Sequence, residues 1–173
     1  MDRVILVFDL FYFILFYSYF FSLIFYFLFC FIFILGGGKT NIVLDLLSKA
    51  DDTFGHIHVV YQTSELLYEH MARELGDKVS FYTSLSEFPL LDHFPNQHLQ
   101  QLVIFDDQVL ESDQSRIKDC FIRGRKIGAG LSFIYISQSY YQIPKIVRLQ
   151  FGYLILLKAG SMKDLRMILG ITV

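Results

Sequence analysis

Hydrophobic positions form one continuous run at the start of the chain and short, separated segments after it. Residues 10–35 carry no charge, and only two serines interrupt the apolar sequence. After residue 40, amphipathic stretches typical of helices alternate with short runs rich in β-branched residues that are typical of strands. This pattern predicts helices over 40–50, 64–75, 114–123 and 161–169, a helix start at Ile143-Pro144, and strands over 56–61, 79–82, 102–105, 131–136 and 153–157.

Two of the predicted strands, 102–105 and 131–136, are almost continuously apolar. Parallel strands that helices cover on both faces have this composition, whereas strands with one face in water alternate apolar and polar residues. Combined with the alternation of strand and helix, it predicts an α/β fold with a parallel sheet and helices on both faces. In such folds ligands bind at the carboxyl ends of the strands.

The apolar run at the N-terminus is long enough to span a bilayer as a helix. A secretory signal peptide fits poorly, because the run is too long and no small-residue cleavage site follows it. Two interpretations stay open: a membrane helix within residues 4–35, or low-complexity sequence joined to the domain by a gene-model error. The absence of Trp and the lack of a linker before the next glycines favour the error. We therefore divide the chain into an apolar tract, 1–35, and a domain, 36–173, which we expect to be truncated.

A glycine-rich segment directly follows the apolar tract. It ends in G-K-T, the final part of a Walker A phosphate-binding loop, in which lysine contacts the outer phosphates and threonine ligates magnesium. The nucleotide-binding candidates are Gly36, Gly37, Gly38, Lys39, Thr40 and Asn41. A complete loop has glycine five positions before Gly38, where this chain has Phe33, so the motif is incomplete.

The apolar strand 102–105 ends on Asp106 and Asp107, as a Walker B strand does. The first carboxylate would then hold magnesium with Thr40, and the second would polarise the attacking water. Gln138 ends the next apolar strand and would sense the γ-phosphate. The alternatives are an acidic turn in solvent and a polar strand end.

Charge is divided unevenly along the chain. Residues 41–113 carry 13 acidic and 3 basic residues, whereas residues 114–173 carry 10 basic and 2 acidic residues, a net charge of +8. A basic surface of this kind suits a polyanion, and Arg123, Arg125 and Lys126 are candidates for contacts to DNA phosphates. A basic turn that is merely solvated is the alternative. Two cysteines, Cys30 and Cys120, provide neither a disulfide framework nor a metal site, and they favour a reducing compartment.

The sequence L-V-I-F-D-D and the segment from Phe121 to Arg148, with its S-Q-S-Y and P-K-x-x-R parts, resemble poxvirus-type virion DNA-packaging ATPases of the FtsK/HerA superfamily. The resemblance implies a RecA-like sheet in which the Gln138 strand lies between the Walker A and Walker B strands. It also implies ATP and Mg²⁺ as cofactors, a homo-oligomeric ring, and translocation of double-stranded DNA. An arginine finger across the subunit interface is implied too, with Arg148, Arg123 or Arg125 as candidates.

The function expected from the sequence is therefore an ATP-driven motor for double-stranded DNA, or a relic of one that no longer turns over. A membrane-anchored, catalytically impaired ATPase-like binding protein is the rival, and a P-loop kinase or other small NTPase is a third possibility. The location would be the membrane if the apolar tract is retained, and otherwise the virion, cytoplasm or nucleus of a host cell.

Overall fold

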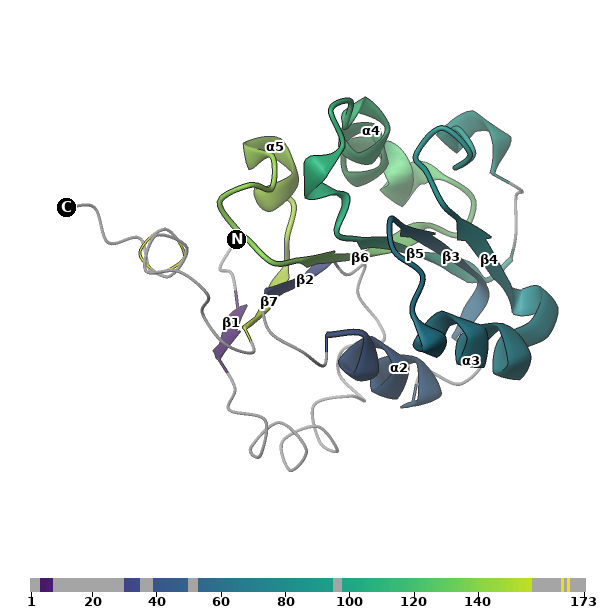
Figure 1. The fold of residues 1–173 in the computed structure, drawn as a ribbon. Coiled ribbons are helices and arrows are strands. Elements are labelled where there is room, and N and C mark those ends of the chain that lie inside the picture. Colours follow the sequence, from purple (N-terminus) through teal and green to yellow (C-terminus); the bar gives the residue numbers. More distant parts are fainter. Residues whose placement is uncertain are drawn as a thin grey trace.

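A computed structural model describes residues 4–7, 30–34, 39–49, 53–94 and 98–156, together with Arg166 and Ile168. Within these ranges the chain forms one parallel sheet with helices on both faces (Figure 1). The strands are β1 (Val4–Val7), β2 (Cys30–Ile34), β3 (Phe54–Tyr61), β4 (Val79–Tyr82), β5 (Gln100–Asp106), β6 (Leu131–Ser137) and β7 (Tyr153–Leu156). The helices are α2 (Lys39–Lys49), α3 (Leu66–Leu75), α4 (Ser115–Arg123) and α5 (Lys145–Arg148), and short 3₁₀ turns occupy Gly76–Lys78, Leu91–His93, Gln108–Leu110 and Gly124–Lys126.

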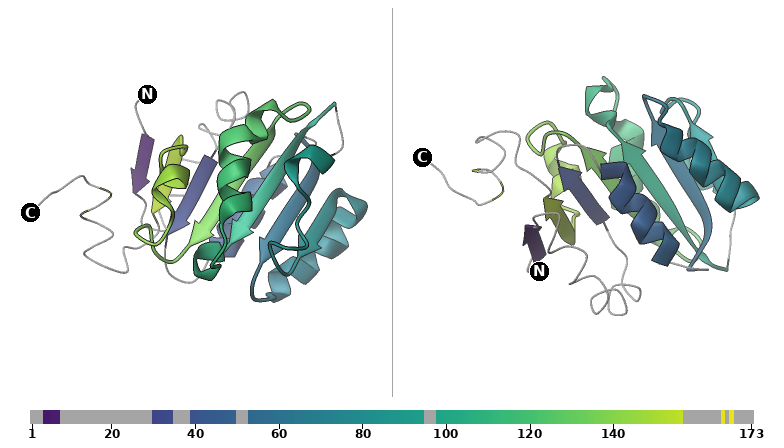
Figure 2. Two further views of the ribbon diagram at one scale, coloured as in Figure 1. Left: turned by 90° about the horizontal axis from the view of Figure 1, so that it is seen from above. Right: turned by 60° about the horizontal axis from the view of Figure 1, so that its bottom comes forward.

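The strand order is β1-β7-β2-β6-β5-β3-β4. Strand β6, which precedes Gln138, thus lies between β2 and β5, in the order that the resemblance to packaging ATPases implies. Parallel neighbours require crossover connections, in which helices pass over one face of the sheet or the other. Figure 2 shows α4 and α5 on one face and α2 and α3 on the other.

The two faces of the sheet bury separate sets of side chains, because successive residues of a strand point to opposite sides. On the α2–α3 face, Leu102 and Ile104 of β5 pack with Val43 and Met71. On the α4–α5 face, Phe105 packs with residues such as Phe121, Phe133 and Val147. Both faces of β5 and β6 are therefore covered, which explains why their sequences are almost continuously apolar, as the analysis of the sequence predicted.

The apolar helix predicted at the N-terminus is wrong for the residues that the structure describes there. Cys30–Ile34 is strand β2, which pairs with β6 on one side and β7 on the other, and Val4–Val7 is strand β1, which pairs with β7. A strand buried in the middle of a parallel sheet and a membrane helix have the same apolar composition, so the sequence pattern did not separate them. Residues 8–29 lie outside the described residues.

None of the helices in the described part of the chain combines the length and the apolar character that a membrane span requires. The predicted helix 161–169 falls outside the described ranges, except for Arg166 and Ile168. The other predicted elements are confirmed, and their ends shift by a few residues at most. Cys120 is a buried free thiol on α4, where burial raises the pKa of its thiol to about 12.

Gly124 lies where α4 passes closely over β6. A Cβ atom at this position would stand 2.4 Å from Cζ of Phe133, and the Phe133 ring is itself almost completely buried. We predict that Gly124→Ala lowers the free energy of unfolding by about 1–3 kcal/mol through overpacking. The measurement is urea unfolding with Gly152→Ala as the matched control, because a Cβ at Gly152 meets no atom within 4 Å. Equal midpoints for both variants would contradict the prediction.

His58 is a buried histidine whose ring nitrogens both have partners. Nε2 donates to Oε1 of Gln101 at 3.0 Å, and Nδ1 accepts from the Tyr82 hydroxyl at 3.1 Å, which suits a neutral ring. Burial lowers the pKa of His58 to about 4, with a smaller contribution from neighbouring His56.

Acidification between pH 6.5 and about 4 should therefore destabilise the protein. In this window the unfolded chain binds a proton that the folded chain does not. The free energy of unfolding therefore decreases as the pH is lowered, by up to about 3 kcal/mol. His58→Gln should flatten this dependence, whereas His70→Gln at an exposed position should leave it unchanged. Urea unfolding across pH 4–7 measures the slope, and equal slopes for wild type and His58→Gln would refute the assignment.

Candidate functional site

The polar residues that follow β5 and β6 meet at the carboxyl edge of the sheet, which we define as the edge where the strands end. In the β5–β6 register Asp106 lies opposite Ile136, and the Asp107 N–H donates to the Ile136 carbonyl at 3.0 Å. Gln138 then reaches across, and its Nε2 donates to Oδ2 of Asp107 at 2.8 Å. The structure thus brings Asp106, Asp107 and Gln138 together.

Asp106 is buried, with 7% of its surface exposed. Its place in the alternation of β5, two residues after Ile104, directs its side chain to the face that α2 and α3 cover. There the hydroxyl of Tyr68 donates to its Oδ2 at 2.5 Å. Asp106 is thus a buried carboxylate on the same face of the sheet as α2. This arrangement is expected of a magnesium ligand in a phosphate-binding site.

Asp107 has a backbone conformation that breaks the strand. Its φ of 53° and ψ of 32° are left-handed, and it is the only residue other than glycine with positive φ among the described residues. Such a conformation costs about 1–3 kcal/mol and is found mostly where a site requires it. Here it ends β5 and points the carboxylate toward Gln138 instead of continuing the alternation of the strand.

Two buried glutamines hold the turn after Asp107 in place. Gln108 donates from Nε2 to the carbonyls of Asp106, at 2.9 Å, and Val60, at 3.4 Å. Gln114 donates to the carbonyl of Gln108 at 3.1 Å. The sequence did not single out either glutamine, because an isolated glutamine in a polar loop has no periodicity or motif that distinguishes it.

Tyr135 of β6 is the register partner of Phe105 and is completely buried. Burial and, secondarily, the charge of Asp107 raise the pKa of Tyr135. Its hydroxyl therefore stays protonated at physiological pH.

The segment predicted to bind phosphate lies between a strand and a helix, as such a loop does. Strand β2 ends at Ile34 and α2 begins at Lys39, so Lys39 and Thr40 open a helix of 11 residues. A helix N-terminus attracts anions through its free N–H groups and its dipole. Asn41 is exposed in the first turn. Gly36, Gly37 and Gly38 lie outside the described residues.

Phe33, at the position of the missing first glycine, belongs to β2. Its register partners are Ile136 of β6 and Ile155 of β7. An aromatic residue suits an extended strand, so the chain continues as β2 through the position where a complete phosphate loop would already turn.

The basic turn lies at the opposite edge of the sheet, because it immediately precedes β6. Gly130 at its end accepts a hydrogen bond from the N–H of Gln101, near the start of β5. Arg123 forms ion pairs with Asp119, at 3.0 Å, and Asp92, at 3.1 Å.

For the other two basic residues of this turn, the described part of the structure gives no ion pair with an acidic group. Arg125 donates to Oε1 of Gln150 at 3.1 Å, and Lys126 is exposed. The DNA-contact candidates therefore share one surface, away from the carboxyl edge.

Arg148, the other arginine-finger candidate, contacts residues of the same chain. Its Nε donates to the carbonyl of Ile143 at 2.9 Å, and its guanidinium lies 5.1 Å from the centre of the Tyr140 ring. These contacts fix the arginine beside α5. A role across a subunit interface stays a prediction.

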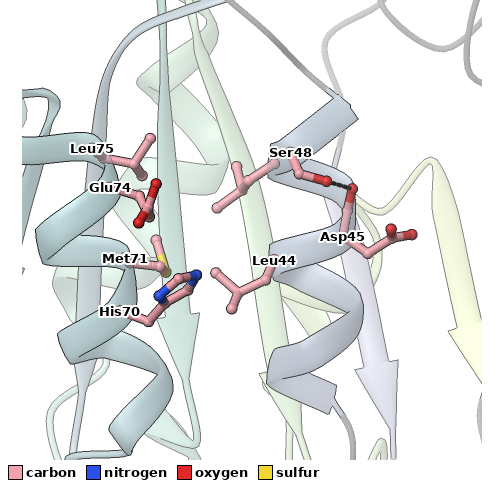
Figure 3. Close-up of a pocket in the computed structure, with 8 residues that line it drawn as sticks. Leu44, Asp45, Ser48, His70, Met71, Glu74 and Leu75 are labelled. Atoms are coloured by element: carbon pink, nitrogen blue, oxygen red, sulfur yellow. Dashed lines mark hydrogen bonds between the residues drawn. The ribbon is translucent and has the colours of Figure 1, made fainter.

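A cavity of about 510 Å³ opens between α2 and α3 (Figure 3). Leu44 and Leu47 of α2 and Met71 and Leu75 of α3 form its apolar part, while Asp45, Ser48, His70 and Glu74 line the remainder. It lies along the two helices and not at the ends of β5 and β6, so it is separate from the cluster of Asp107 and Gln138.

The side chains at the carboxyl edge include the kind of oxygen ligand that magnesium takes in nucleotide sites. Within the described ranges, no three His, Cys, Asp or Glu side chains come together as a metal-binding group. Magnesium in nucleotide sites needs only one or two protein carboxylates, because phosphate oxygens and water complete its coordination. Asp106 supplies such a hard oxygen ligand, and Thr40 belongs to the first turn of α2, the helix on the same face of the sheet.

No protein-family model matches this chain, and no curated protein matches it either. Solved structures do. The cytoplasmic domain of EssC aligns with a TM-score of 0.61 at 17% identity, covering 83% of this chain and 34% of that one. EssC (ATPases 2 and 3) from Geobacillus thermodenitrificans aligns with a TM-score of 0.55 at 10% identity, with coverages of 83% and 34%.

The Pyrococcus furiosus Hef helicase domain aligns with a TM-score of 0.54 at 13% identity, covering 88% of this chain and 39% of that one. This chain therefore spans between a third and two fifths of the length of these three structures. At these identities the likeness concerns the fold. Taken with the strand order, it shows that the chain has the fold of P-loop ATPase domains.

Proposed function

We propose that this protein is an ATP-hydrolysing motor domain that moves double-stranded DNA, as viral genome-packaging ATPases do. The observation that carries the proposal is the cluster at the carboxyl edge, where Gln138 donates to the Asp107 carboxylate beside the buried Asp106. Strand order places this cluster next to β2 and the helix that Lys39 opens. A phosphate site after β2 and paired carboxylates at the end of β5, one strand away across β6, are the parts that phosphoryl transfer to water requires.

Each residue has a distinct role in this proposal. The N-terminus of α2 and Lys39 bind the phosphates of ATP, with Gly36, Gly37, Gly38 and Asn41 completing the loop. Thr40 and Asp106 hold Mg²⁺. Asp107 accepts a proton from the attacking water, and Gln138, bonded to it, senses whether the γ-phosphate is present.

DNA binding is proposed for the basic turn, which lies away from the nucleotide edge. A motor that moves along DNA needs contacts to the phosphate backbone that do not depend on sequence. Arg125 and Lys126 are exposed and carry no ion pair among the described residues, whereas Arg123 is paired with two aspartates. Assembly into a homo-oligomeric ring would allow an arginine of one subunit to complete the site of the next.

One observation favours a second candidate function. Because β2 continues through Phe33, only four residues, 35 to 38, separate Ile34 from Lys39. A shortened loop cradles phosphates less completely, which favours an ATPase-like domain that binds a partner without turnover. Nucleotide binding by the wild-type chain separates the two candidates.

ATP turnover should depend on the carboxylate of Asp107. DNA-stimulated ATP hydrolysis by the full chain should fall roughly 100-fold or more in Asp107→Asn, because the general base is lost while the phosphate contacts remain. Lys39→Ala should weaken ATP binding itself. Asp77→Asn, at an exposed turn after α3, is the control and should behave as wild type.

Phosphate-release kinetics and binding of a fluorescent ATP analogue together provide the measurement. A wild-type chain that binds ATP without hydrolysing it would support the second candidate. A chain that binds no ATP would contradict the motor.

Affinity for duplex DNA should depend on the exposed residues of the basic turn. Arg125→Ala and Lys126→Ala should each reduce the slope of log affinity for duplex DNA against log salt concentration by about 1. Arg123→Ala should have a smaller effect, because Asp92 and Asp119 already neutralise its charge. Arg73→Ala on α3 is the control. Fluorescence anisotropy at several salt concentrations measures the slopes, and unchanged slopes in both variants would exclude this surface.

A further inference from the structure

The side chain of Asp106 has a partner on a helix, Tyr68 of α3. Its hydroxyl donates to Oδ2 of Asp106 across 38 positions of sequence. No phosphate-loop or carboxylate motif includes this tyrosine. It lies in the third position of α3, in the segment L-L-Y-E-H-M, where the sequence shows only an amphipathic helix.

Packing fixes the position of this hydroxyl. Only 4% of Tyr68 is exposed, and its ring centre lies 5.1 Å from that of Tyr61 and 5.9 Å from that of Phe81. Tyr61 is also the residue of β3 that lies opposite Asp106 in the register of the sheet. The same aromatic cluster thus holds the ring of Tyr68 and flanks the strand position that carries the carboxylate.

A hydrogen bond to one carboxylate oxygen fixes the plane of the group. Rotation about the last side-chain bond of an aspartate is otherwise soft, so an unrestrained carboxylate samples many orientations. A bond to an ionised acceptor is roughly twice as strong as one between neutral groups, and this one lies where water is largely excluded. The direction in which the other oxygen points is therefore set by α3.

We propose that Tyr68 is a positioning residue for the magnesium site, orienting the Asp106 carboxylate toward the metal that accompanies ATP. The inference rests on the proposed function, because it assumes that Asp106 serves Mg²⁺. Residues that orient metal ligands commonly change metal affinity about 10- to 100-fold when they are removed. Helix α3 becomes part of the nucleotide site through this contact.

The test compares Tyr68→Phe with Tyr61→Phe in the full chain. Each variant removes one hydroxyl from the same aromatic cluster, but only the first breaks the bond to Asp106. Binding of a fluorescent ATP analogue is titrated with Mg²⁺. The Mg²⁺ concentration at half-saturation should rise about 10-fold or more in Tyr68→Phe and stay at the wild-type value in Tyr61→Phe. Binding of the analogue without Mg²⁺ should be equal in all three proteins.

A double variant separates positioning from general loss of stability. In the Asp106→Asn background, Tyr68→Phe should cause no further change in the Mg²⁺ midpoint, because the two residues act through one interaction. An additive effect, or an unchanged midpoint in Tyr68→Phe alone while the wild type shows a clear Mg²⁺ requirement, would overturn this inference only. A wild-type chain that binds no nucleotide at any Mg²⁺ concentration would overturn the proposed function, and this inference with it.

Discussion

Coverage of the central strands on both faces is the constraint on which the rest of the structure depends. Strands β2, β6 and β5 lie side by side and parallel, so their backbone groups are paired within the sheet. Helices α2 and α3 cover one face, and α4 and α5 cover the other. Burial of so much apolar surface holds the register, and the register alone decides which polar residues meet where the strands end.

The candidate site is built from that register and from a few buried polar contacts. Asp107 and Gln138 are 31 positions apart in sequence, yet they follow adjacent strands and meet at one edge. The turn that presents Asp107 is strained at one residue and is held by Gln108 and Gln114. Stability from the sheet thus supports a local conformation that would not persist in an isolated loop.

The two edges of the sheet carry different chemistry. The carboxyl edge gathers carboxylates, an amide and the start of α2, all of which suit a nucleotide with its metal ion. The opposite edge carries the basic turn, in which Gly124 is required by the close approach of Phe133. This separation is compatible with a motor that couples hydrolysis to a grip on DNA.

The sequence by itself determined the parallel α/β fold, the carboxylates at the end of β5 and the order of the elements, because apolar periodicity and strand-end residues are local properties of the chain. It did not determine that Cys30–Ile34 is a strand, since a central strand and a membrane helix share one composition. Nor did it reveal Tyr68, Gln108 or Gln114 as parts of the site. Their roles come from contacts between segments distant in sequence, and only the packing of α3 and α4 on the sheet brings those atoms within hydrogen-bonding distance.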